Sequence, residues 1–432
     1  MPTLRSSDRD FASRLAAFVG TGEADPATRA AAARIIEDVR RRGDAAVLAA
    51  TLRFDRAKLA AGDLRIPPAR LAAAAKALTP ERRRAIQDAI ASVRDFHRRT
   101  LPKGWMARNA HGARVGERHL PIRRCGLYIP GGQVPLVSTV VMTAIPARVA
   151  GVPEVVACTP PGPDGAVHPD LLAALHLCGV REVYRIGGVQ AVAAMALGTR
   201  AVAPVDKVFG PGNAFVTEAK RQLFGRVGVD LLPGPSEVMV IADRTANPEW
   251  VAADLCAQAE HGSGKETLYL VTDSAKLAAA ATKAADRQCR SLSHGAKVRA
   301  ILAKRLLTVR VRDLAEAADV ANRVAPEHLE LLVADRAIDR LARSITTAGA
   351  MLLGHRTPTV LGDFVAGPSH TLPTGGTGRF FSGLRVADFL RRTSVVRYDA
   401  ASLRKAAPTV AAFAAMERLD AHGRSLAIRL GR

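Results

Sequence analysis

Cysteine is scarce in this chain of 432 residues, and its scarcity excludes two kinds of architecture. Cys125, Cys158, Cys178, Cys256 and Cys289 are scattered, odd in number and form no C-x-x-C pair. A disulfide framework and a thiolate metal site both need paired or closely spaced cysteines. This usage is typical of a protein in a reduced cytosol, so we expect a cytoplasmic location.

Long apolar runs and aromatic residues are also lacking. The most apolar stretch, residues 134–151, is interrupted by Pro135, Pro146 and Arg148, so no membrane-spanning helix is expected. Residues 1–15 mix charges and have no apolar signal core. Aromatic residues make up 4% of the chain and apolar residues 48%, which predicts a core of Ala, Val and Leu packed by helices and parallel strands.

Acidic residues are few relative to basic ones, and the formal net charge is +22. A basic surface can attract nucleic acid or anionic metabolites. The arginine clusters at Arg40–Arg42 and Arg82–Arg84 lie in helical patterns beside acidic residues, without an aromatic platform or a nucleic-acid motif. We interpret them as solvated helix faces and keep nucleic-acid binding as the non-enzyme alternative.

The chain alternates β-branched runs with helical stretches, which predicts an α/β fold. PEVVACTPP, VREVYRIGG and VDKVFGPG end in Gly or Pro and are separated by helical segments, as in a parallel sheet; SEVMVIAD and ETLYLVTD repeat this pattern. Residues 26–100 are predicted to be helical, beginning with a helix that an acidic residue and Pro open and Gly43 ends. Residues 1–23 are expected to form a helical arm, and the last residues a helical tail.

Glycine-containing loops follow several predicted strands, namely YIPGGQ, GGVQA and GPGNAF. Ligands bind at the carboxyl ends of parallel strands, where glycine lets the backbone approach a phosphate group. The chain has no G-x-G-x-x-G fingerprint with a downstream acid, so these loops alone do not define a dinucleotide site.

The stretch RVAPEHLELLV sets Glu327 directly against His328, after Pro326. In a regular strand the two side chains would point to opposite faces, and inside a helix they would not face each other. At a helix start both could lean into one cleft, and Pro326 suits the first helical position. The stretch therefore predicts a helix start. At this start Glu327 and His328 form either an acid–base pair or part of an ordinary solvated helix end with a partly exposed His.

Residue types that bind metals recur in other stretches. Gln258 and His261 are expected on one face of a helix that Gly262 caps. Two His, one carboxylate and one amide oxygen could ligate zinc, although their separations show no metal-site spacing. Taken alone, each His is better explained as a core or surface residue. The other candidates are Asp363 and His370 in LGDFVAGPSH, and Glu417 and His422 near the end of the last helix, in MERLDAHG.

Eight motifs in order along the chain resemble those of the L-histidinol dehydrogenase family. They are GLYIPGG, GPGNAFVTEAKRQ, PGPSEVMVIAD, AQAEHG, PEHLE, GDF, SHTLPTGG and ERLDAHG, and they extend from about residue 25 to the C-terminus. The resemblance implies a zinc- and NAD-dependent homodimer that oxidises L-histidinol via L-histidinal to L-histidine, the last step of histidine biosynthesis.

The resemblance also implies roles for individual residues. Glu327 and His328 would be the catalytic acid–base pair. His328 would take the alcohol proton as hydride leaves, and Glu327 would activate the water that hydrates the aldehyde. Zinc would act as a template for the substrate nitrogens. The implied zinc ligands are Gln258, His261, Asp363 and His422; the NAD contacts are Tyr128, Gln190 and Asn213; and the substrate contacts are Ser236, Gln258, His261, His328, Asp363, His370, Glu417 and His422.

The implied fold is α/β with two incomplete Rossmann-like parallel-sheet domains, a small helical N-terminal arm and a C-terminal tail. The tail carries apolar residues that it cannot bury alone, and the family's dimer implies that Glu417 and His422 reach across to the partner's site. The expected divisions are residues 1–23 for the arm, 24–127 with 235–384 for a discontinuous zinc and substrate domain, 128–234 for the NAD-contacting domain and 385–432 for the dimerisation tail.

Two other functions within the same scaffold are considered. A related zinc dehydrogenase could act on a sulfonated diol, but Glu417 suits an imidazole N–H better than a sulfonate. A non-catalytic zinc-binding relative is disfavoured by the intact Glu327–His328 pair. Pro233, in place of the small residue that often precedes GPS, and the high net charge are departures from the family pattern that do not touch the site.

Overall fold

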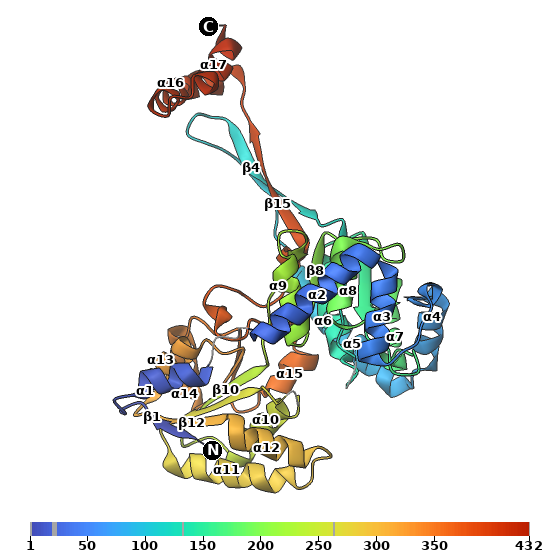
Figure 1. Ribbon diagram of the computed structural model, residues 1–432. Coiled ribbons are helices and arrows are strands. Elements are labelled where there is room, and N and C mark those ends of the chain that lie inside the picture. The colour runs from blue at the N-terminus through green and yellow to red at the C-terminus, as the bar shows by residue number, and fades with distance from the viewer. Residues whose placement is uncertain (1, 20–23, 132–133, 262–263, 432) are drawn as a thin grey trace.

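The computed structural model describes residues 2–19, 24–131, 134–261 and 264–431. Figure 1 shows two α/β units and an arm that carries the C-terminus away from both. Two six-stranded sheets and one three-stranded sheet form the framework of the described residues. The predicted α/β class with parallel sheets is confirmed.

The first six-stranded sheet, here called the β5 sheet, has the order β2-β7-β6-β5-β8-β9. Its neighbours are parallel except β2 and β7, and Leu127 of β5 pairs with Ala157 of β6 and Phe209 of β8. The strand order reverses between β5 and β8, which is where ligands bind in open α/β sheets. The strands are β2 (Arg65–Ile66), β5 (Arg124–Tyr128), β6 (Glu154–Thr159), β7 (Glu182–Arg185), β8 (Lys207–Phe209) and β9 (Gly228–Val229).

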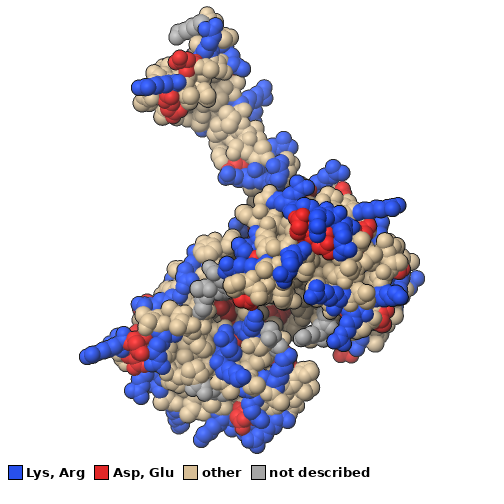
Figure 2. Space-filling model, in the orientation of Figure 1, with Lys and Arg blue, Asp and Glu red and all other residues tan. Residues whose placement is uncertain are grey.

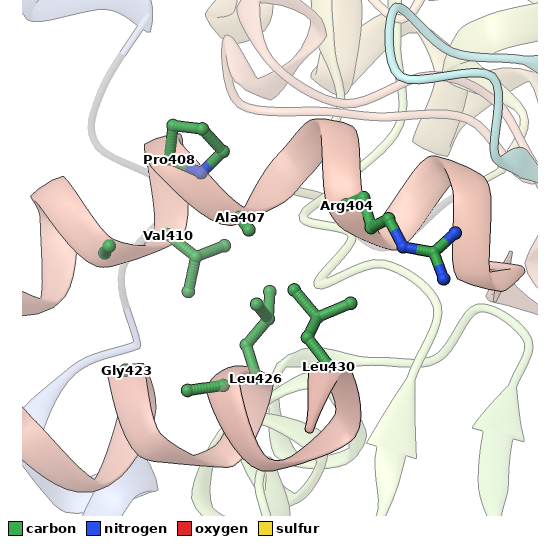
Figure 3. Close-up of a pocket in the computed structure, with 9 residues that line it drawn as sticks. Arg404, Ala407, Pro408, Val410, Gly423, Leu426 and Leu430 are labelled. Atoms are coloured by element: carbon green, nitrogen blue, oxygen red, sulfur yellow. The ribbon is translucent and has the colours of Figure 1, made fainter. Parts of the chain in front are cut away.

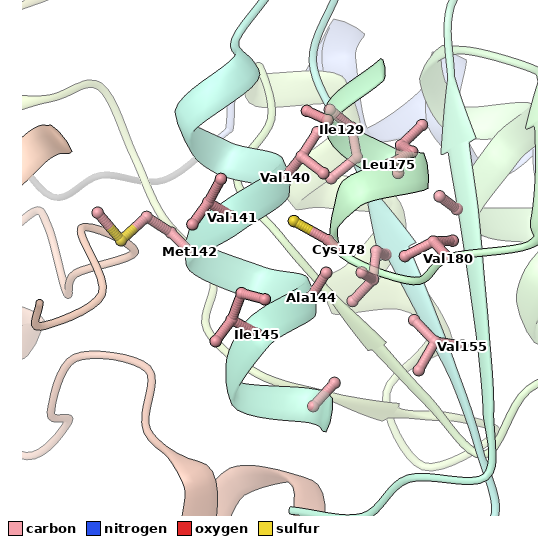
Figure 4. Packing of buried hydrophobic residues seen from close by; sticks show 14 of the residues in the cluster. Ile129, Val140, Val141, Met142, Ala144, Ile145, Val155, Leu175, Cys178 and Val180 are labelled. Carbon is pink, nitrogen blue, oxygen red and sulfur yellow. The ribbon is translucent and has the colours of Figure 1, made fainter. Parts of the chain in front are cut away.

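Helices cover both faces of the β5 sheet. The crossover helices are α6 (Val137–Val149), α7 (Pro169–Leu177), α8 (Gly188–Leu197) and α9 (Ala214–Leu223). On one face α6 and α7 form a core of small aliphatic side chains with the strands, part of which is drawn in Figure 4. This core is rich in Ala, Val, Ile and Leu, as the composition predicted.

The helices of residues 26–99 pack on the β5 sheet as well. They are α2 (Pro26–Arg42), α3 (Asp44–Asp55), α4 (Pro68–Ala77) and α5 (Pro80–Arg99). As predicted, α2 is capped by the Asp25 side chain and ends at Gly43, whose φ is +54°. Apolar faces of α2 and α3 share a core with α8 and α9, and those of α4 and α5 share one with α6 and α7. This grouping differs from the expected division, which joined residues 24–127 to residues 235–384.

The second six-stranded sheet, here called the β10 sheet, has the order β1-β12-β11-β10-β13-β14 and is parallel throughout. Helices α10 (Pro248–Ala259), α11 (Ala275–Cys289) and α12 (Gly295–Arg305) pack around one core, and α1 (Phe11–Val19), α13 (Leu314–Val324) and α14 (Asp335–Ser344) around the other. The strands are β1 (Thr3–Arg5), β10 (Glu237–Ala242), β11 (Thr267–Thr272), β12 (Leu306–Arg310), β13 (His328–Leu332) and β14 (Ala350–Leu353).

The N-terminal arm is only partly helical. Residues Thr3–Arg5 add a strand to the edge of the β10 sheet, with Leu4 opposite Val309 and 3% exposed. The expectation of a helical arm over residues 1–23 is thus wrong for its first part, because an exposed sheet edge offers hydrogen bonds and a place to bury Leu4. Residues 20–23 of the expected arm lie outside the described residues.

The C-terminal tail is not helical throughout, because a strand follows its first short helical turn. β15 (Leu390–Arg397) pairs antiparallel with β4 (Arg114–Pro121), and β4 pairs with β3 (Trp105–Arg108). The β-branched residues Thr393, Val395 and Val396 favour this extended conformation. Two helices follow, α16 (Ala400–Met416) and α17 (Asp420–Ala427), at the far end of the arm in Figure 1. The short elements not yet named are η1 (Ala61–Asp63), α15 (Thr359–Phe364), η2 (Thr377–Arg379), η3 (Val386–Phe389) and η4 (Ile428–Leu430).

Basic side chains are spread over the face shown in Figure 2, with acidic side chains among them. In the cluster Arg40–Arg42, Arg40 pairs with Glu37, and Arg42 lies 2.5 Å from Asp38 on the same helix. These are the contacts expected of solvated helix faces. None of the helices in the described part of the chain is both long and apolar enough to span a membrane.

Candidate active site

Glu327 and His328 lie at the amino end of a buried strand. β13 begins at His328, so the predicted helix start at Pro326 is wrong. The apolar run that follows is paired on both sides, with β10 and β14, and inter-strand hydrogen bonds therefore replace the helical ones. Glu327 and His328 are only 6% and 5% exposed, which excludes the partly exposed His of the alternative interpretation.

The main chain of Glu237, the first residue of β10, holds both side chains. Its N–H donates to Glu327 Oε2 at 2.7 Å, and its carbonyl oxygen lies 3.2 Å from His328 Nδ1. A carbonyl group only accepts hydrogen bonds, so Nδ1 carries the proton of the neutral ring and Nε2 keeps a free lone pair. Glu327 Oε2 lies 3.7 Å from His328 Nδ1, so the two side chains meet although they are adjacent in the chain.

Burial shifts the pKa of both groups toward their neutral forms. Removal from water lowers the pKa of His328 to about 4 and raises the pKa of Glu327 well above its usual value, and the Glu237 and Asp363 charges raise the latter further. His328 is therefore neutral near pH 7 and can accept a proton at Nε2. Such opposed shifts in adjacent groups are typical of acid–base sites.

Asp363 and His370 approach His328 from the segment after β14. Asp363 Oδ1 lies 3.8 Å from His328 Nε2 and 3.9 Å from His370 Nδ1. His370 is held on both sides, because its Nδ1 lies 3.1 Å from the Asp363 carbonyl oxygen and its Nε2 lies 3.3 Å from Thr139 Oγ1 of α6. Burial raises the pKa of Asp363 to about 6 and lowers the pKa of His370 to about 4.

Gln258 and His261 complete this side of the site from the end of α10. The helix ends at Ala259, so His261 lies just beyond it, with its Nδ1 3.2 Å from the Gln258 carbonyl oxygen. His261 is close enough to influence the pKa of Asp363, His328 and His370. Gln258 is 3% exposed, and its Nε2 has no hydrogen-bond partner among the described residues. Gly262, expected as the cap of this helix, lies outside the described residues.

A buried carboxyl pair joins the three elements that carry these groups. Glu330 Oε1 of β13 accepts hydrogen bonds from the N–H and hydroxyl of Thr359, at the start of α15, both at 2.6 Å. Its carboxyl group also contacts that of Asp254 on α10, and burial followed by the Asp254 charge raises the pKa of Glu330 to about 8. Two carboxyl groups in contact are stable when they share a proton. This pair was not predicted from the sequence, in which its only signal is an acid inside an apolar strand.

The zinc ligands implied by the sequence are only partly assembled within one chain. The described residues contain no group of three or more His, Cys, Asp and Glu side chains that could hold a metal ion. His261 nevertheless lies close enough to Asp363 to influence its pKa. The unpartnered Gln258 amide can present its oxygen to a ligand, because the O and N assignment of an amide is interchangeable. The donor types of Gln258, His261 and Asp363 suit zinc, and the fourth implied ligand, His422, lies elsewhere.

Glu417 and His422 do not reach this site in the chain that carries them. Glu417 follows α16, and His422 lies in α17, so the expected single last helix is two helices, with Arg418 at φ +53° between them. Figure 1 shows both helices at the end of the arm, whereas α15 lies between the two six-stranded sheets. Ser236, by contrast, directly precedes Glu237, and its carbonyl oxygen accepts from the Thr267 N–H at 3.1 Å.

The expected NAD contacts lie at the carboxyl edge of the β5 sheet. Tyr128 ends β5 and its hydroxyl oxygen accepts from the Gly188 N–H at 3.1 Å. Gln190 lies in the first turn of α8, after β7, and Asn213 caps α9, after β8. Gln190 is 1% exposed and its Nε2 has no partner among the described residues, whereas Asn213 is exposed. The structure therefore places all three around the point where the strand order reverses.

A second buried pair, also missed from the sequence, fixes the loop before Asn213. Lys220 forms an ion pair with Asp230, and both side chains are about 1% exposed. Lys220 Nζ donates to the Gly210 carbonyl oxygen at 3.0 Å, and the Gly210 N–H donates to Asp230 Oδ2 at 2.7 Å. Gly210 has a φ of +109°, and a Cβ there would lie 2.2 Å from the Tyr128 carbonyl oxygen, so only glycine fits.

The fold and the candidate site suit an α/β oxidoreductase, in which one sheet carries the expected dinucleotide contacts and the other the buried Glu327 and His328. The chain belongs to the histidinol dehydrogenase family, whose profile matches residues 21–430. The resemblance seen in the eight motifs is thus confirmed.

Individual relatives match over nearly the whole length. Histidinol dehydrogenases of Bradyrhizobium diazoefficiens and Ruegeria pomeroyi are 46% and 45% identical, over 99% of this chain and 98% of each relative. The crystal structure of histidinol dehydrogenase from Elizabethkingia anophelis superimposes with a TM-score of 0.93 at 32% identity, covering 100% of this chain and 98% of that one. These matches give no support to the sulfonated-diol or nucleic-acid alternatives.

Proposed function

We propose that this protein oxidises L-histidinol to L-histidine with NAD, as the last step of histidine biosynthesis. The observation that carries the proposal is the pair at the amino end of β13, where a neutral His328 presents Nε2 and Glu327 lies beside it. His328 accepts the hydroxyl proton as a hydride leaves the alcohol carbon. In its ionised form, which the raised pKa makes a stronger base, Glu327 then takes a proton from the water that adds to the aldehyde, and loss of a second hydride gives the carboxylate.

The proposed reaction also needs NAD and zinc, and the implied ligand residues suit both. NAD would supply the hydride acceptor, and zinc would be held by Gln258, His261, Asp363 and His422, where it would supply a Lewis-acidic template for substrate nitrogens. Ser236, His370 and Glu417 complete the proposed substrate contacts, and Tyr128, Gln190 and Asn213 those to NAD. The simplest test supplies L-histidinol, NAD and zinc to the purified protein, and two NADH per histidinol are expected. Absence of NADH formation would refute the proposal.

We further propose that the protein is a homodimer with shared sites. The arm leaves large apolar side chains uncovered, with Phe413, Met416 and Ile428 more than half exposed. A groove of about 310 Å³ between α16 and α17 is lined mainly by apolar residues, several of which are drawn in Figure 3. A partner subunit would cover these surfaces and receive Glu417 and His422 in its own site, which then gains the fourth zinc donor.

Mixed dimers test the sharing of sites. A chain with His328→Ala is co-expressed with a chain with His422→Ala, each of which is nearly inactive alone. If sites are shared, one site of a mixed dimer carries both changes and the other none. Random pairing makes half of the dimers mixed, so activity returns to roughly a quarter of wild type. Activity that stays at background would show that His422 serves its own chain.

We place the reaction in the cytoplasm. All five cysteines are unpaired and buried, which suits a reducing compartment. A cell fractionation in which the protein appears with a periplasmic marker would contradict this location.

A further inference from the structure

The edge of the β5 sheet contains a carboxylate that the proposed reaction does not use. Asp55 is the last residue of α3, about seventy residues before β5 in the chain. Its Oδ2 is enclosed and has no hydrogen-bond partner among the described residues. Burial raises the pKa of this carboxyl group to about 6. An enclosed carboxylate oxygen without a donor is costly, so it indicates a place where a ligand or water supplies one.

Asp55 reaches the carboxyl ends of two strands. A Cβ built on Gly187 would lie 2.6 Å from Pro160 Cβ and 3.3 Å from Asp55 Oδ1. Pro160 directly follows β6, and Gly187 lies just after β7. The carboxylate is also near Tyr128, because burial and then the Asp55 charge raise the pKa of that hydroxyl to about 12. Asp55 therefore belongs to the same edge as the proposed NAD contacts.

Two other polar groups at this edge also lack partners among the described residues. Thr159, the last residue of β6, is 0% exposed with its Oγ1 unpartnered, and Gln190 is 1% exposed with its Nε2 unpartnered. Gly131 follows β5, and a Cβ there would lie 2.8 Å from Thr159 Oγ1. Polar groups that are almost completely buried nearly always have a hydrogen-bond partner. Several such groups without one at the same edge therefore point to a polar ligand that binds there.

The strand order indicates which part of a bound dinucleotide would lie near Asp55. Counting from β5, the order β7-β6-β5-β8 is that of a mononucleotide-binding half, in which an acid at the end of the second strand binds the adenosine ribose. Here the second strand is β6, and Thr159 is followed by Pro160 and Pro161 instead of an acid. Asp55 brings a carboxylate to this position from a distant part of the chain.

We propose that Asp55 determines the cofactor preference of this protein, by accepting hydrogen bonds from the adenosine ribose hydroxyls of NAD and repelling the 2′-phosphate of NADP. The proposal rests on the proposed use of a nicotinamide dinucleotide. Gly187 keeps the space beside Asp55 open, because a side chain at this position would contact both Pro160 and the Asp55 carboxylate.

The test measures binding of two fragments in the absence of substrate. Calorimetry compares ADP-ribose with 2′-phospho-ADP-ribose for wild type, Asp55→Asn and Asp44→Asn. Wild type binds ADP-ribose more tightly. Asp55→Asn weakens ADP-ribose binding about tenfold or more, as for loss of a hydrogen bond to a charged group, and leaves or improves binding of the phosphorylated fragment. Asp44, at the other end of α3, bonds to the Ala201 N–H, so its variant keeps the wild-type ratio.

The outcomes separate this inference from the proposed reaction. An unchanged affinity ratio in Asp55→Asn, an equal loss for both fragments, or a wild-type preference for the phosphorylated fragment would overturn the role of Asp55. Thermal melting of each variant shows whether an equal loss reflects misfolding. A change in the kcat/KM ratio for NAD and NADP accompanies the binding change in the active enzyme. If wild type discriminates between the fragments but forms no NADH from histidinol, the inference stands and the proposed function fails.

Discussion

The two six-stranded sheets place their candidate functional residues at opposite ends of their strands. On the β5 sheet, Tyr128, Gln190 and Asn213 follow the carboxyl ends of strands. On the β10 sheet, Glu327 and His328 lie at the amino end of β13, next to the amino end of β10. The usual position of ligands in open α/β sheets thus describes the first sheet and not the second.

This difference corresponds to two ways of making a site. The β5 edge uses glycine loops and helix starts, which are suited to an extended phosphate-containing ligand. The β10 edge encloses its candidate residues. Because they are buried, His328, Glu327 and Asp363 all have pKa values shifted toward the neutral form. Five predictions test this difference between the two sheets, beginning with whether binding depends on one sheet and proton transfer on the other.

The largest effect is expected from His328→Ala, which removes the proposed proton acceptor on the β10 sheet. Loss of a general base lowers kcat by about 10²–10⁴-fold. Binding of NAD, which we propose to depend on the β5 sheet, should stay within about twofold of wild type. Stopped-flow kinetics and cofactor titration measure the two quantities, with His176→Ala on the exposed face of α7 as the control. A comparable loss of NAD binding would remove the proposed division between the sheets.

Glu327→Gln tests whether Glu327 and His328, both on the β10 sheet, serve different steps of the reaction. The amide keeps the size of the side chain but cannot take a proton from water, so histidinal oxidation should slow more than histidinol oxidation. Single-turnover experiments with a hydrazine trap should then detect accumulated aldehyde. Wild-type rates of histidinal oxidation would show that Glu327 does not have this role.

Lys220→Met should affect the β5 sheet in the converse way. It leaves Asp230 buried without its partner, and breaking a buried ion pair in this way costs roughly 3–5 kcal/mol. The Gly210 loop also loses a hydrogen bond, so KM for NAD should rise while the pH profile of kcat keeps its shape. Urea unfolding and steady-state kinetics measure these effects. The surface variant Arg226→Met, at an exposed position just after the same helix, serves as the comparison.

Glu330→Ala and Glu330→Gln test the carboxyl pair that joins α10, β13 and α15. Alanine leaves the Thr359 N–H and hydroxyl and Asp254 without a partner, at a cost of about 1–3 kcal/mol, and zinc affinity should fall because Gln258 and Asp363 lie on the joined helices. Glutamine can accept from Thr359 and donate to Asp254, so it should restore both properties. Equal damage from the two variants would show that Glu330 does not share a proton.

The smallest effect concerns a buried His on the β5 sheet. His97 of α5 is 0% exposed, has no partner for either ring nitrogen among the described residues, and has its pKa lowered by burial to about 4. The unfolded chain binds a proton on His97 below about pH 6.5, and the folded chain does not until about pH 4. Stability should therefore fall as pH falls through this range, and less so in His97→Leu. Melting temperatures at pH 7 and pH 4.5 measure the difference; parallel curves would contradict it.

The sequence by itself determined the fold class, most of the strands and the family. Runs of β-branched residues, helical periodicity and capping residues are local features of the chain. For this reason α2 with its caps, and strands such as β6 and β10, were predictable. The residue types of the candidate site were also visible, because the eight motifs preserve them in order.

Tertiary structure decided what the local pattern left open. Pro326 allowed a helix, but partners on both sides made His328–Leu332 a strand. The residue that holds Glu327 and His328 is Glu237, about ninety residues earlier, and it acts through main-chain atoms that any residue type has. The pairs Asp254–Glu330 and Lys220–Asp230, and the position of Asp55, depend on which elements meet in space. Burial then sets the pKa values, and burial is a property of the packed chain that sequence spacing does not encode.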